Sequence, residues 1–504
     1  VETLQRKVIE ALIARWEKAP PDHPVILAGS TGSRGATQLL MKAVARLPQG
    51  AVILPGFDSD MPPHVWGKLD NPLLSEDHPQ YRFAHLLKEL EMSPQDVVPW
   101  SGDRPANPAR NRLVSLALRP APVTDQWLRD GVTLTDLEGA TRDVTLLEAP
   151  STRMEALCIA MRLREAAENG EYAALITPDR TLSRQVTAAL TRWNIVPDDS
   201  AGIPLHLSPP GRFMRHVAEL MFQPLSSAAL LTLLKHPLTH SAEKRGPHIR
   251  LTRELELYLR RGGIPYPEAH HLGAWADGMK DEMAPGWASW VISTMTGGMI
   301  DRDMPMGALV ETHRRRSEEI ARGSASTEGT GELWQESAGR DLHAVVKNLA
   351  ENATYGGDIC ANDYANIFHS VLTAKQVRKG ETGDTHPRIL IWGTLEARVQ
   401  GADLLILAGL NEGTWPATPA PDPWLNRELR AQARLLLPER RIGLSAHDFQ
   451  QAVLAPEVWL TRSVRSDESE TIPSRWLNRL QNLLSGLPNE GKSALEAMKR
   501  RGDT

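Results

Sequence analysis

The spacing of apolar and polar positions predicts a chain of short buried strands and amphipathic helices. Apolar runs of about four to eight residues, bounded by turn residues, are typical of strands covered on both faces. Six such runs stand out: Val25–Ala28, Ala51–Leu54, Val144–Leu147, Ala173–Ile176, Arg388–Trp392 and Asp403–Ala408. Helical spacing follows several of them, as in Ala36–Arg46. Strands that alternate with helices imply parallel pairing and an α/β fold class.

The strand pattern stops between Leu205 and about Asp384. Helical stretches replace it, separated by loops that contain Gly, Pro and His. These stretches cover 213–222, 227–235, 249–261, 309–321 and 333–352. Because strands resume at Arg388, we expect a helical insertion within an α/β domain. The predicted parts of the chain are therefore 1–142, 143–204, 205–385 and 386–504.

A polar turn, Gly393–Asp403, lies between the last two predicted strands. It brings a hydroxyl, carboxylates and a guanidinium to the carboxyl end of a strand, where open α/β sheets present their functional residues. The next strand opens into Gly409–Pro416, which is rich in turn residues and ends at a rigid proline. We therefore expect the functional residues to gather in the stretch His386–Pro416.

The string EARVQGADLLILAGLNEGTWP, with the later ERRIGLSAHDFQQA and SRWLNRL, resembles AddB in its alphaproteobacterial form. AddB is the helicase-like and nuclease subunit of AddAB, the bacterial helicase-nuclease that resects double-strand DNA breaks. The resemblance extends over nearly the whole chain and is most specific at ARVQGAD and GLNEGTWP. It implies RecA-like parallel sheets of a superfamily 1 helicase-like scaffold with a large all-helical insertion. Residues 1–142 would be a partial first RecA-like domain with its connection, 143–204 and 386–504 the two parts of a second, and 205–385 the accessory insertion.

The resemblance also implies candidate DNA contacts. In active helicases of this class, the turn that corresponds to the one after Trp392 carries motif V. This motif contains a threonine, contacts DNA and couples DNA binding to ATP. The first candidates are Thr394, Arg398, Gln400 and Asn411. A second group shares one helical face by its spacing of three and four residues, and is a candidate for contact with DNA or with a partner subunit: Arg427, Arg430 and Arg434.

Two glycine-rich motifs raise the alternative of a nucleotide site. Gly29, Gly32 and Gly35 stand between a strand and a helix, and Asp58 follows the next strand, as in dinucleotide-binding domains. No Tyr-x-x-x-Lys follows to supply the proton donor of the short-chain dehydrogenases. Gly486–Ser493 matches G-x-x-x-x-G-K-S, but helical spacing precedes it, whereas a phosphate loop needs a preceding strand. Without such a loop, the chain lacks the lysine and the bound Mg²⁺ that stabilise the phosphates during phosphoryl transfer.

Composition limits the partners and the cofactors. A formal net charge of −5 restricts any DNA contact to a local basic patch. Two cysteines cannot supply a four-thiolate iron–sulfur site, and so few favour a reducing cytoplasm. No apolar run approaches the ~20 residues needed to span a membrane. The spacing of four histidines matches no standard zinc site: His236, His240, His270 and His271.

We therefore expect a portion of an AddB-type subunit that has no active site of its own, binds DNA and docks to an AddA-like helicase-nuclease subunit in a heterodimer. The parent complex would be an ATP-dependent helicase/exonuclease. The resemblance implies that ATP and Mg²⁺ bind in the partner motor, and that the nuclease metal and any iron–sulfur cluster belong to a C-terminal domain outside this chain. Two alternatives stay open: a nucleotide-dependent enzyme that uses Gly29–Gly35 or Gly486–Ser493, and a protein-docking module.

Overall fold

The computed structural model describes residues 2–32, 35–102, 105–120, 125–242, 245–324, 328–377, 385–394, 401–433, 435–466, 469–488 and 490–503. The chain forms two compact units. Unit 1 combines Val1–Ser200 with Asp384–Thr504, and unit 2 is Ala201–Gly383. The two breaks lie close to the expected boundaries after residues 204 and 385, whereas the boundary expected after residue 142 falls inside unit 1.

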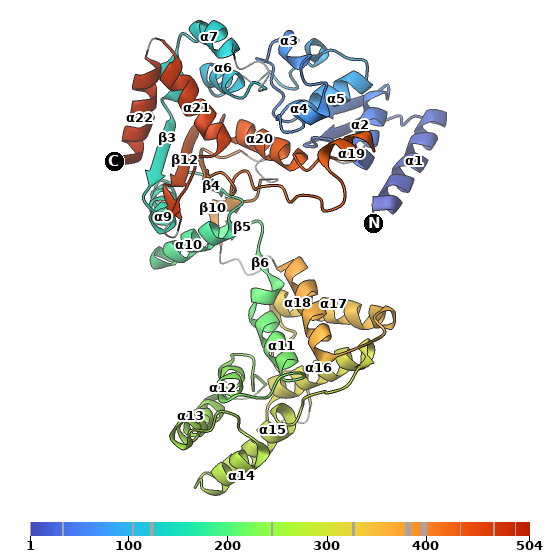
Figure 1. The fold of residues 1–504 in the computed structure, drawn as a ribbon, viewed down its shortest axis with the longest axis vertical. Helices are drawn as coiled ribbons and strands as arrows, with labels where there is room; N and C mark the ends of the chain where they lie inside the picture. The colour runs from blue at the N-terminus through green and yellow to red at the C-terminus, as the bar shows by residue number, and fades with distance from the viewer. Residues whose placement is uncertain are drawn as a thin grey trace. The chain divides into compact units, whose positions relative to one another are not determined.

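Unit 1 is built around a six-stranded parallel sheet in the order β3–β12–β11–β4–β10–β5 (Figure 1). Its strands are β3 (Val144–Ala149), β4 (Ala173–Ile176), β5 (Pro197–Asp199), β10 (His386–Trp392), β11 (Leu404–Leu407) and β12 (Glu457–Ser463). The α/β class and the parallel pairing are therefore confirmed. The sequence pattern placed β10 and β11 to within two residues, but it did not predict β12.

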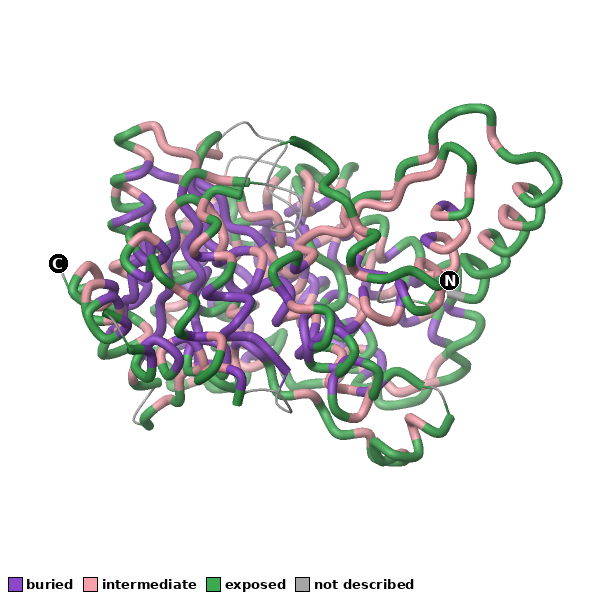
Figure 2. Tube along the Cα trace, turned by 90° about the horizontal axis from the view of Figure 1, so that it is seen from above, coloured by how far each residue is buried: buried purple, intermediate pink, exposed green. Residues whose placement is uncertain are grey.

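Alternate residues of the central strands point to opposite faces of the sheet. Leu175 and Ile406 pack against α9 (Thr152–Asn169) and α10 (Arg180–Leu190) on one face. Ile176 and its neighbours pack on the other face against helices that lie far away in the sequence. These are α6 (Pro108–Ala117), α8 (Leu137–Thr141), α20 (Arg440–Ala452), α21 (Arg475–Gly486) and α22 (Gly491–Asp503). Covered on both faces, the central strands are continuously apolar. Figure 2 shows stretches of buried chain, in purple, with exposed segments around them.

Gly502 lets α22 lie directly on β3. A Cβ atom added at Gly502 would lie 2.2 Å from the backbone oxygen of Leu146 and 3.0 Å from the Cα of Leu147. Replacing Gly502 by alanine is therefore expected to lower the free energy of unfolding by about 1 to 3 kcal/mol, measured by urea denaturation. Gly273→Ala in a helix of unit 2 is the control, because nothing lies within 4 Å of its added Cβ. Equal losses in the two variants would contradict the close approach.

The first part of unit 1 contains a separate parallel pair, β1 (Val25–Ala28) with β2 (Gly50–Ile53). The helices α1 (Glu2–Lys18) and α2 (Gly35–Ala45) pack against each other beside this pair. Short helices follow: α3 (Pro63–Trp66), α4 (Pro72–Ser75), α5 (Tyr81–Glu89) and α7 (Gln126–Asp130). Unit 1 also contains α19 (Arg427–Gln432) and the antiparallel pair of β13 (Arg465–Ser466) with β14 (Ser469–Glu470).

Unit 2 is largely helical, as expected for the insertion. Its helices are α11 (Pro209–Glu219), α12 (Ser227–Lys235), α13 (Arg245–Gly262), α14 (Ala269–Asp277), α15 (Ala284–Met295), α16 (Met306–Arg322), α17 (Glu336–Asn352) and α18 (Ala361–Ala374). The prediction of an all-helical insertion is wrong in one detail, because two antiparallel pairs of two-residue strands are present. They are β6 (Ile203–Pro204) with β9 (Gln376–Val377), and β7 (Met304–Pro305) with β8 (Asp358–Ile359). The β6–β9 pair brings the two ends of the unit together.

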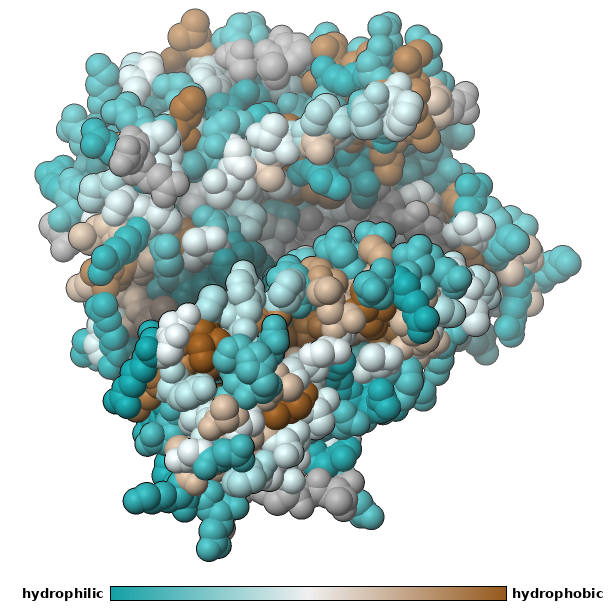
Figure 3. All heavy atoms as spheres, turned by 60° about the horizontal axis from the view of Figure 1, so that its bottom comes forward, coloured by the Kyte–Doolittle hydropathy of each residue, from teal (hydrophilic) through white to brown (hydrophobic). Residues whose placement is uncertain are grey.

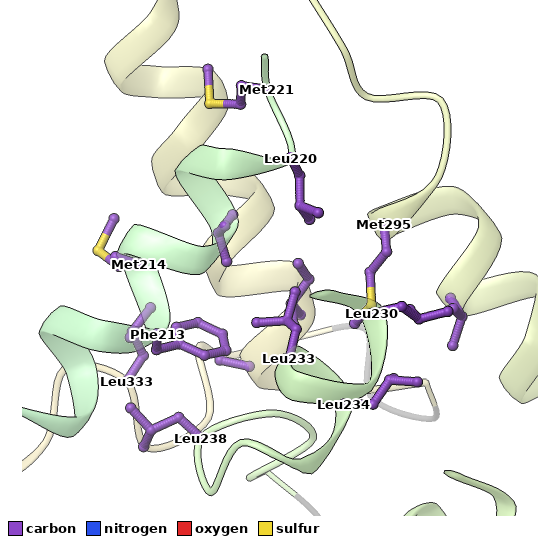
Figure 4. Close-up of a cluster of buried hydrophobic side chains, with 14 of the residues drawn as sticks. Phe213, Met214, Leu220, Met221, Leu230, Leu233, Leu234, Leu238, Met295 and Leu333 are labelled. Atoms are coloured by element: carbon purple, nitrogen blue, oxygen red, sulfur yellow. The ribbon is translucent and has the colours of Figure 1, made fainter. Parts of the chain in front are cut away.

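The core of unit 2 is formed by large aliphatic, sulfur-containing and aromatic side chains. Figure 4 shows Phe213 of α11 close to Leu233 of α12, in a cluster that also contains Leu220 and Leu234. No described helix of the chain is long and apolar enough to cross a membrane. On the face drawn in Figure 3, hydrophilic side chains predominate and hydrophobic ones are scattered among them.

Two fully buried histidines, His248 and His313, tie the helices of unit 2 together. His248 donates from Nε2 to the carbonyl oxygen of Leu234 (2.7 Å), and its Nδ1 accepts from the indole Nε1 of Trp287 (3.0 Å). A carbonyl can only accept and an indole N–H can only donate, so this ring is neutral with its proton on Nε2.

His313 is held in the same way. Its Nε2 donates to the carbonyl oxygen of Met214 (2.8 Å), and its Nδ1 accepts from the hydroxyl of Tyr364 (2.8 Å). Burial lowers the pKa of both His248 and His313 to about 4. The packing of unit 2 therefore depends on two imidazoles that stay uncharged.

Candidate functional site

The crevice of the large sheet lies where neighbouring strands send their connections to opposite faces. After β4 the chain enters α10 on one face, whereas after the adjacent β11 it proceeds to α20 on the other. Such a divergence leaves an opening beyond the carboxyl ends of the strands, which is the usual ligand position in open α/β sheets. A cavity of about 410 Å³ occupies this place. Its walls are formed by Thr152, Glu155, Asp179, Leu182, Gly409, Asn411, Glu412, Gly413, Thr414, Thr418, Ser463, Ser466, Glu470, Thr471 and Ile472.

Glu155, in the first turn of α9, is the most deeply buried charged group of this cavity, with 1% of its surface exposed. Its Oε1 accepts hydrogen bonds from the backbone N–H of Gly409 (2.9 Å) and from the hydroxyl of Thr461 (2.8 Å). Within the described residues its Oε2 accepts no hydrogen bond and the carboxylate forms no ion pair. Burial raises the pKa of Glu155. The cavity therefore contains a carboxylate whose second oxygen is free.

Asp179 lies beside Glu155 at the N-terminus of α10. Its Oδ1 accepts from the backbone N–H groups of Thr181 (2.7 Å) and Leu182 (3.1 Å), which is the usual arrangement of an N-cap. These N–H groups are the ones that would otherwise bind an anion at the helix N-terminus. The negative charge of Asp179 also adds to the rise in the pKa of Glu155.

The cavity is acidic. Among the lining residues that the structure describes, four carry carboxylates and none is Lys, Arg or His. Two of the four are paired outside the cavity: Glu412 lies 3.1 Å from the Nε of Arg475, and Glu470 lies 3.8 Å from Arg465. The other two, Glu155 and Asp179, form no ion pair with any residue that the structure describes. An anionic ligand would meet the negative charges of Glu155 and Asp179 here, which the charge of Arg462 offsets only in part.

Asn411, one of the predicted DNA contacts, lines the cavity but uses its side chain internally. Its Nδ2 donates to the carbonyl oxygen (3.1 Å) and the hydroxyl (3.2 Å) of Ser463, and its Oδ1 accepts from the Nε of Arg462 (3.0 Å). Arg462, at 4% exposure, also donates from Nη1 to Glu148 (2.9 Å) and from Nη2 to Thr471 (3.0 Å). Asn411 therefore anchors the turn after β11 to β12.

The other predicted contacts are dispersed. Thr394 is half-buried just after β10, beside the turn in which Arg398 and Gln400 lie outside the described residues, as does Arg434. The structure brings Arg427 and Arg430 together on α19.

Both of these arginines make internal bonds. Arg427 lies 2.6 Å from Glu439 and donates to the carbonyl of Leu73 (2.9 Å). Arg430 pairs with Asp422 and donates to the carbonyl of Leu436 (2.8 Å). The guanidinium groups of α19 are therefore less available to bind DNA phosphates than the spacing of the arginines predicts.

The structure shows the surroundings of the two glycine-rich motifs. Helix α21 ends at Gly486 and α22 begins at Gly491, so a helix precedes the G-x-x-x-x-G-K-S match where a strand would be needed, and Lys492 is exposed. The helix expected before this match is confirmed, and that the match is coincidental stays a prediction.

At the other motif, Gly29 and Gly32 adopt positive φ angles of 79° and 64° after β1. Asp58, which a dinucleotide site would need for a ribose, is buried and accepts from the Nε2 of Gln450 (3.1 Å). Burial raises the pKa of Asp58 to about 6. This carboxyl is committed to the packing of α20 against the first part of unit 1.

The sequence pattern did not predict Glu155 and Asp179 as site residues. The signal was present, since each follows a predicted buried strand and stands in the first turn or at the cap of the next helix. Among the described residues no group of three His, Cys, Asp or Glu side chains is placed to hold a metal ion. Comparison of the chain with models of known protein families and with curated protein sequences gives no match.

Proposed function

We propose that this chain is the helicase-like scaffold of an AddB-type subunit, which holds DNA and docks to an AddA-like motor during the resection of double-strand breaks. The proposal rests on the resemblance of the stretch around β10 and β11 to that family. The six-stranded parallel sheet and the helical unit inserted between β5 and β10 are compatible with a RecA-like domain that carries an accessory insertion.

The single observation that favours a scaffold over a motor is the acidic crevice. A triphosphate site places free helix N–H groups, a lysine and Mg²⁺ around the phosphates. Here Asp179 occupies the N–H groups of α10, and Glu155 lies in the first turn of α9. Phosphate would be repelled from the position that it usually takes in such a sheet. The chain would accordingly bind no ATP at this crevice and would leave hydrolysis to its partner.

The phosphates of DNA are negatively charged, as are those of ATP, so the proposed contact with a DNA strand lies outside the acidic crevice. The candidates that remain are Thr394 after β10, with Arg398 and Gln400 in the turn that follows it. The arginines of α19 are secondary candidates because their guanidinium groups already have internal partners.

Two measurements test this proposal on the purified chain. Calorimetry with Mg²⁺ and ATP is expected to show no binding, whereas single-stranded DNA is expected to bind with an affinity that falls as salt rises. Arg398→Ala should weaken DNA binding several-fold and reduce the salt slope by about one. Arg192→Ala removes an exposed arginine elsewhere in unit 1 and serves as the control.

The alternatives predict different results. A tight nucleotide site that is abolished by Gly32→Val or Lys492→Ala would establish a nucleotide-dependent enzyme. DNA binding that is absent at every salt concentration would leave a protein-docking module. Equal DNA affinities of Arg398→Ala and Arg192→Ala would remove the turn after β10 from the DNA contact.

A further inference from the structure

We infer that the acidic crevice binds an organic cation, meaning a ligand or a partner's side chain that carries an ammonium or guanidinium group. The inference concerns the residues at the carboxyl ends of β3, β4, β11 and β12, and it stands whether or not the chain binds DNA.

The first argument is the state of Glu155. Carboxylates that are withdrawn from water are normally paired with a cation or fully hydrogen-bonded. Glu155 is 1% exposed, yet only its Oε1 accepts hydrogen bonds, and no described Lys, Arg or His pairs with it. Because the residue lines the cavity, the free Oε2 is placed to accept an N–H from a bound group. An N–H cation would satisfy the oxygen and the charge together.

The second argument is the position of Asp179. Its Oδ1 is used by the N-cap of α10, but the carboxylate has no ion-pair partner among the described residues. Asp179 and Glu155 interact electrostatically across the same cavity. Two negative groups that face one space repel each other, and a cation between them would relieve that repulsion.

The third argument is the size and the lining of the cavity. A volume of about 410 Å³ is far larger than a metal ion, and the described residues offer no three-residue metal cluster. Hydroxyl groups occupy much of the remaining wall and can accept N–H bonds in several directions. They belong to Thr152, Thr414, Thr418 and Ser466, whereas the hydroxyls of Ser463 and Thr471 already bond to Asn411 and Arg462. The walls thus fit an extended group with several N–H donors better than a compact ion.

The test is calorimetry on the full chain at low salt and about pH 7.5, with agmatine, spermidine and MgCl₂ as probes. Agmatine, which carries one guanidinium and one ammonium group, is expected to bind at one site. Glu155→Gln and Asp179→Asn should each lower its affinity by about tenfold or more. The glutamine oxygen can still accept from Gly409 and Thr461, and asparagine remains a good N-cap, so both variants keep the local structure. Glu17→Gln removes an exposed carboxylate of α1 and is the control.

Further measurements distinguish the source of the cation. Stronger binding of a short blocked peptide with one central arginine than of agmatine would assign the crevice to a partner's side chain, and the reverse order would assign it to a small molecule. Binding should also weaken as the pH falls and Glu155 becomes protonated, because its pKa is already raised. The inference is overturned if no organic cation binds at millimolar concentration, if MgCl₂ alone binds, or if both variants bind agmatine as the wild type does while their thermal unfolding is unchanged.

Discussion

Replacing Arg462 by methionine is expected to lower the free energy of unfolding by about 3 to 5 kcal/mol, because it breaks a buried charged network. The guanidinium of Arg462 donates to Asn411, Glu148 and Thr471 at 2.9 to 3.0 Å. Methionine fills much of the same space but donates no hydrogen bond. The oxygens of these three partners would then lose their donor within unit 1, and desolvated acceptors without donors are costly.

The loss of stability should be smaller than if Glu148 were left without any cationic partner, because this carboxylate keeps a second one. The Nζ of Lys499 lies 2.9 Å from its other oxygen. Burial alone would raise the pKa of Glu148, but the hydrogen bonds from Lys499 and Arg462 outweigh it and hold this pKa below its usual value. Glu148 therefore keeps one cationic partner in the variant.

Guanidinium chloride denaturation at neutral pH measures the effect of Arg462→Met. The matched control is Arg465→Met, three residues further along the chain, whose side chain is 64% exposed and lies 3.8 Å from Glu470. Exposed pairs of this kind contribute little, so the control should change stability by less than about 0.5 kcal/mol. If the two variants lose the same stability, the network around Arg462 does not hold the turn after β11 in place.

Local patterns predicted the individual strands of the sheet well, since each central strand is apolar on both faces. Ala173–Ile176 was placed without error, and Arg388–Trp392 nearly so. β12 was not predicted because Glu457–Ser463 mixes charged and apolar residues. Its polar positions have partners that only the folded sheet supplies, such as Asn411 and Glu148 for Arg462.

The position of the candidate site in the sheet could be predicted from the sequence, but the side chains that form it could not. The carboxyl end of β11 was expected to be functional, and it does border the cavity. The strand order, however, brings β11 next to β4 and β12, which are distant in the sequence. From the sequence, Asn411 was therefore expected to be free to bind a ligand, although in the fold it holds Arg462. Glu155 was seen only as a residue of the first turn of a helix. A short polar residue after a strand can face a ligand or brace a turn, and the sequence alone does not distinguish these roles.

Acid is expected to unfold unit 2 before unit 1. His248 and His313 have a folded-state pKa of about 4, against an ordinary value of 6.5. The unfolded chain therefore binds more protons between these values, so stability is fully present above about pH 6.5 and is lost as the pH falls toward about 4. Each histidine would cost about 3 kcal/mol over this window.

Unit 1 contains opposing groups. Burial lowers the pKa of His78 to about 3, which also destabilises unit 1 on acidification, but burial raises the pKa of Asp58 to about 6. The folded state then binds the extra proton at Asp58 between its unfolded value near 3.8 and about 6, so this group adds stability as the pH falls. The two contributions have opposite signs and similar size, about 3 kcal/mol each down to about pH 4.

Hydrogen exchange followed by mass spectrometry, together with thermal unfolding at a series of pH values, measures which unit unfolds first as the pH falls. Between about pH 7 and about pH 4.5, protection should fall in α13 and α16 before it falls in β4 and β11. His313→Gln keeps a side-chain donor for the carbonyl of Met214 but cannot titrate. Because burial also lowers the pKa of His236 in unit 2 to about 4, this variant should remove about a third of the acid sensitivity of unit 2. His343→Gln replaces an exposed histidine of α17 and should leave that sensitivity unchanged. If β4 and β11 lose protection first, or if His313→Gln and His343→Gln behave alike, then the neutral histidines do not determine where acid unfolding begins.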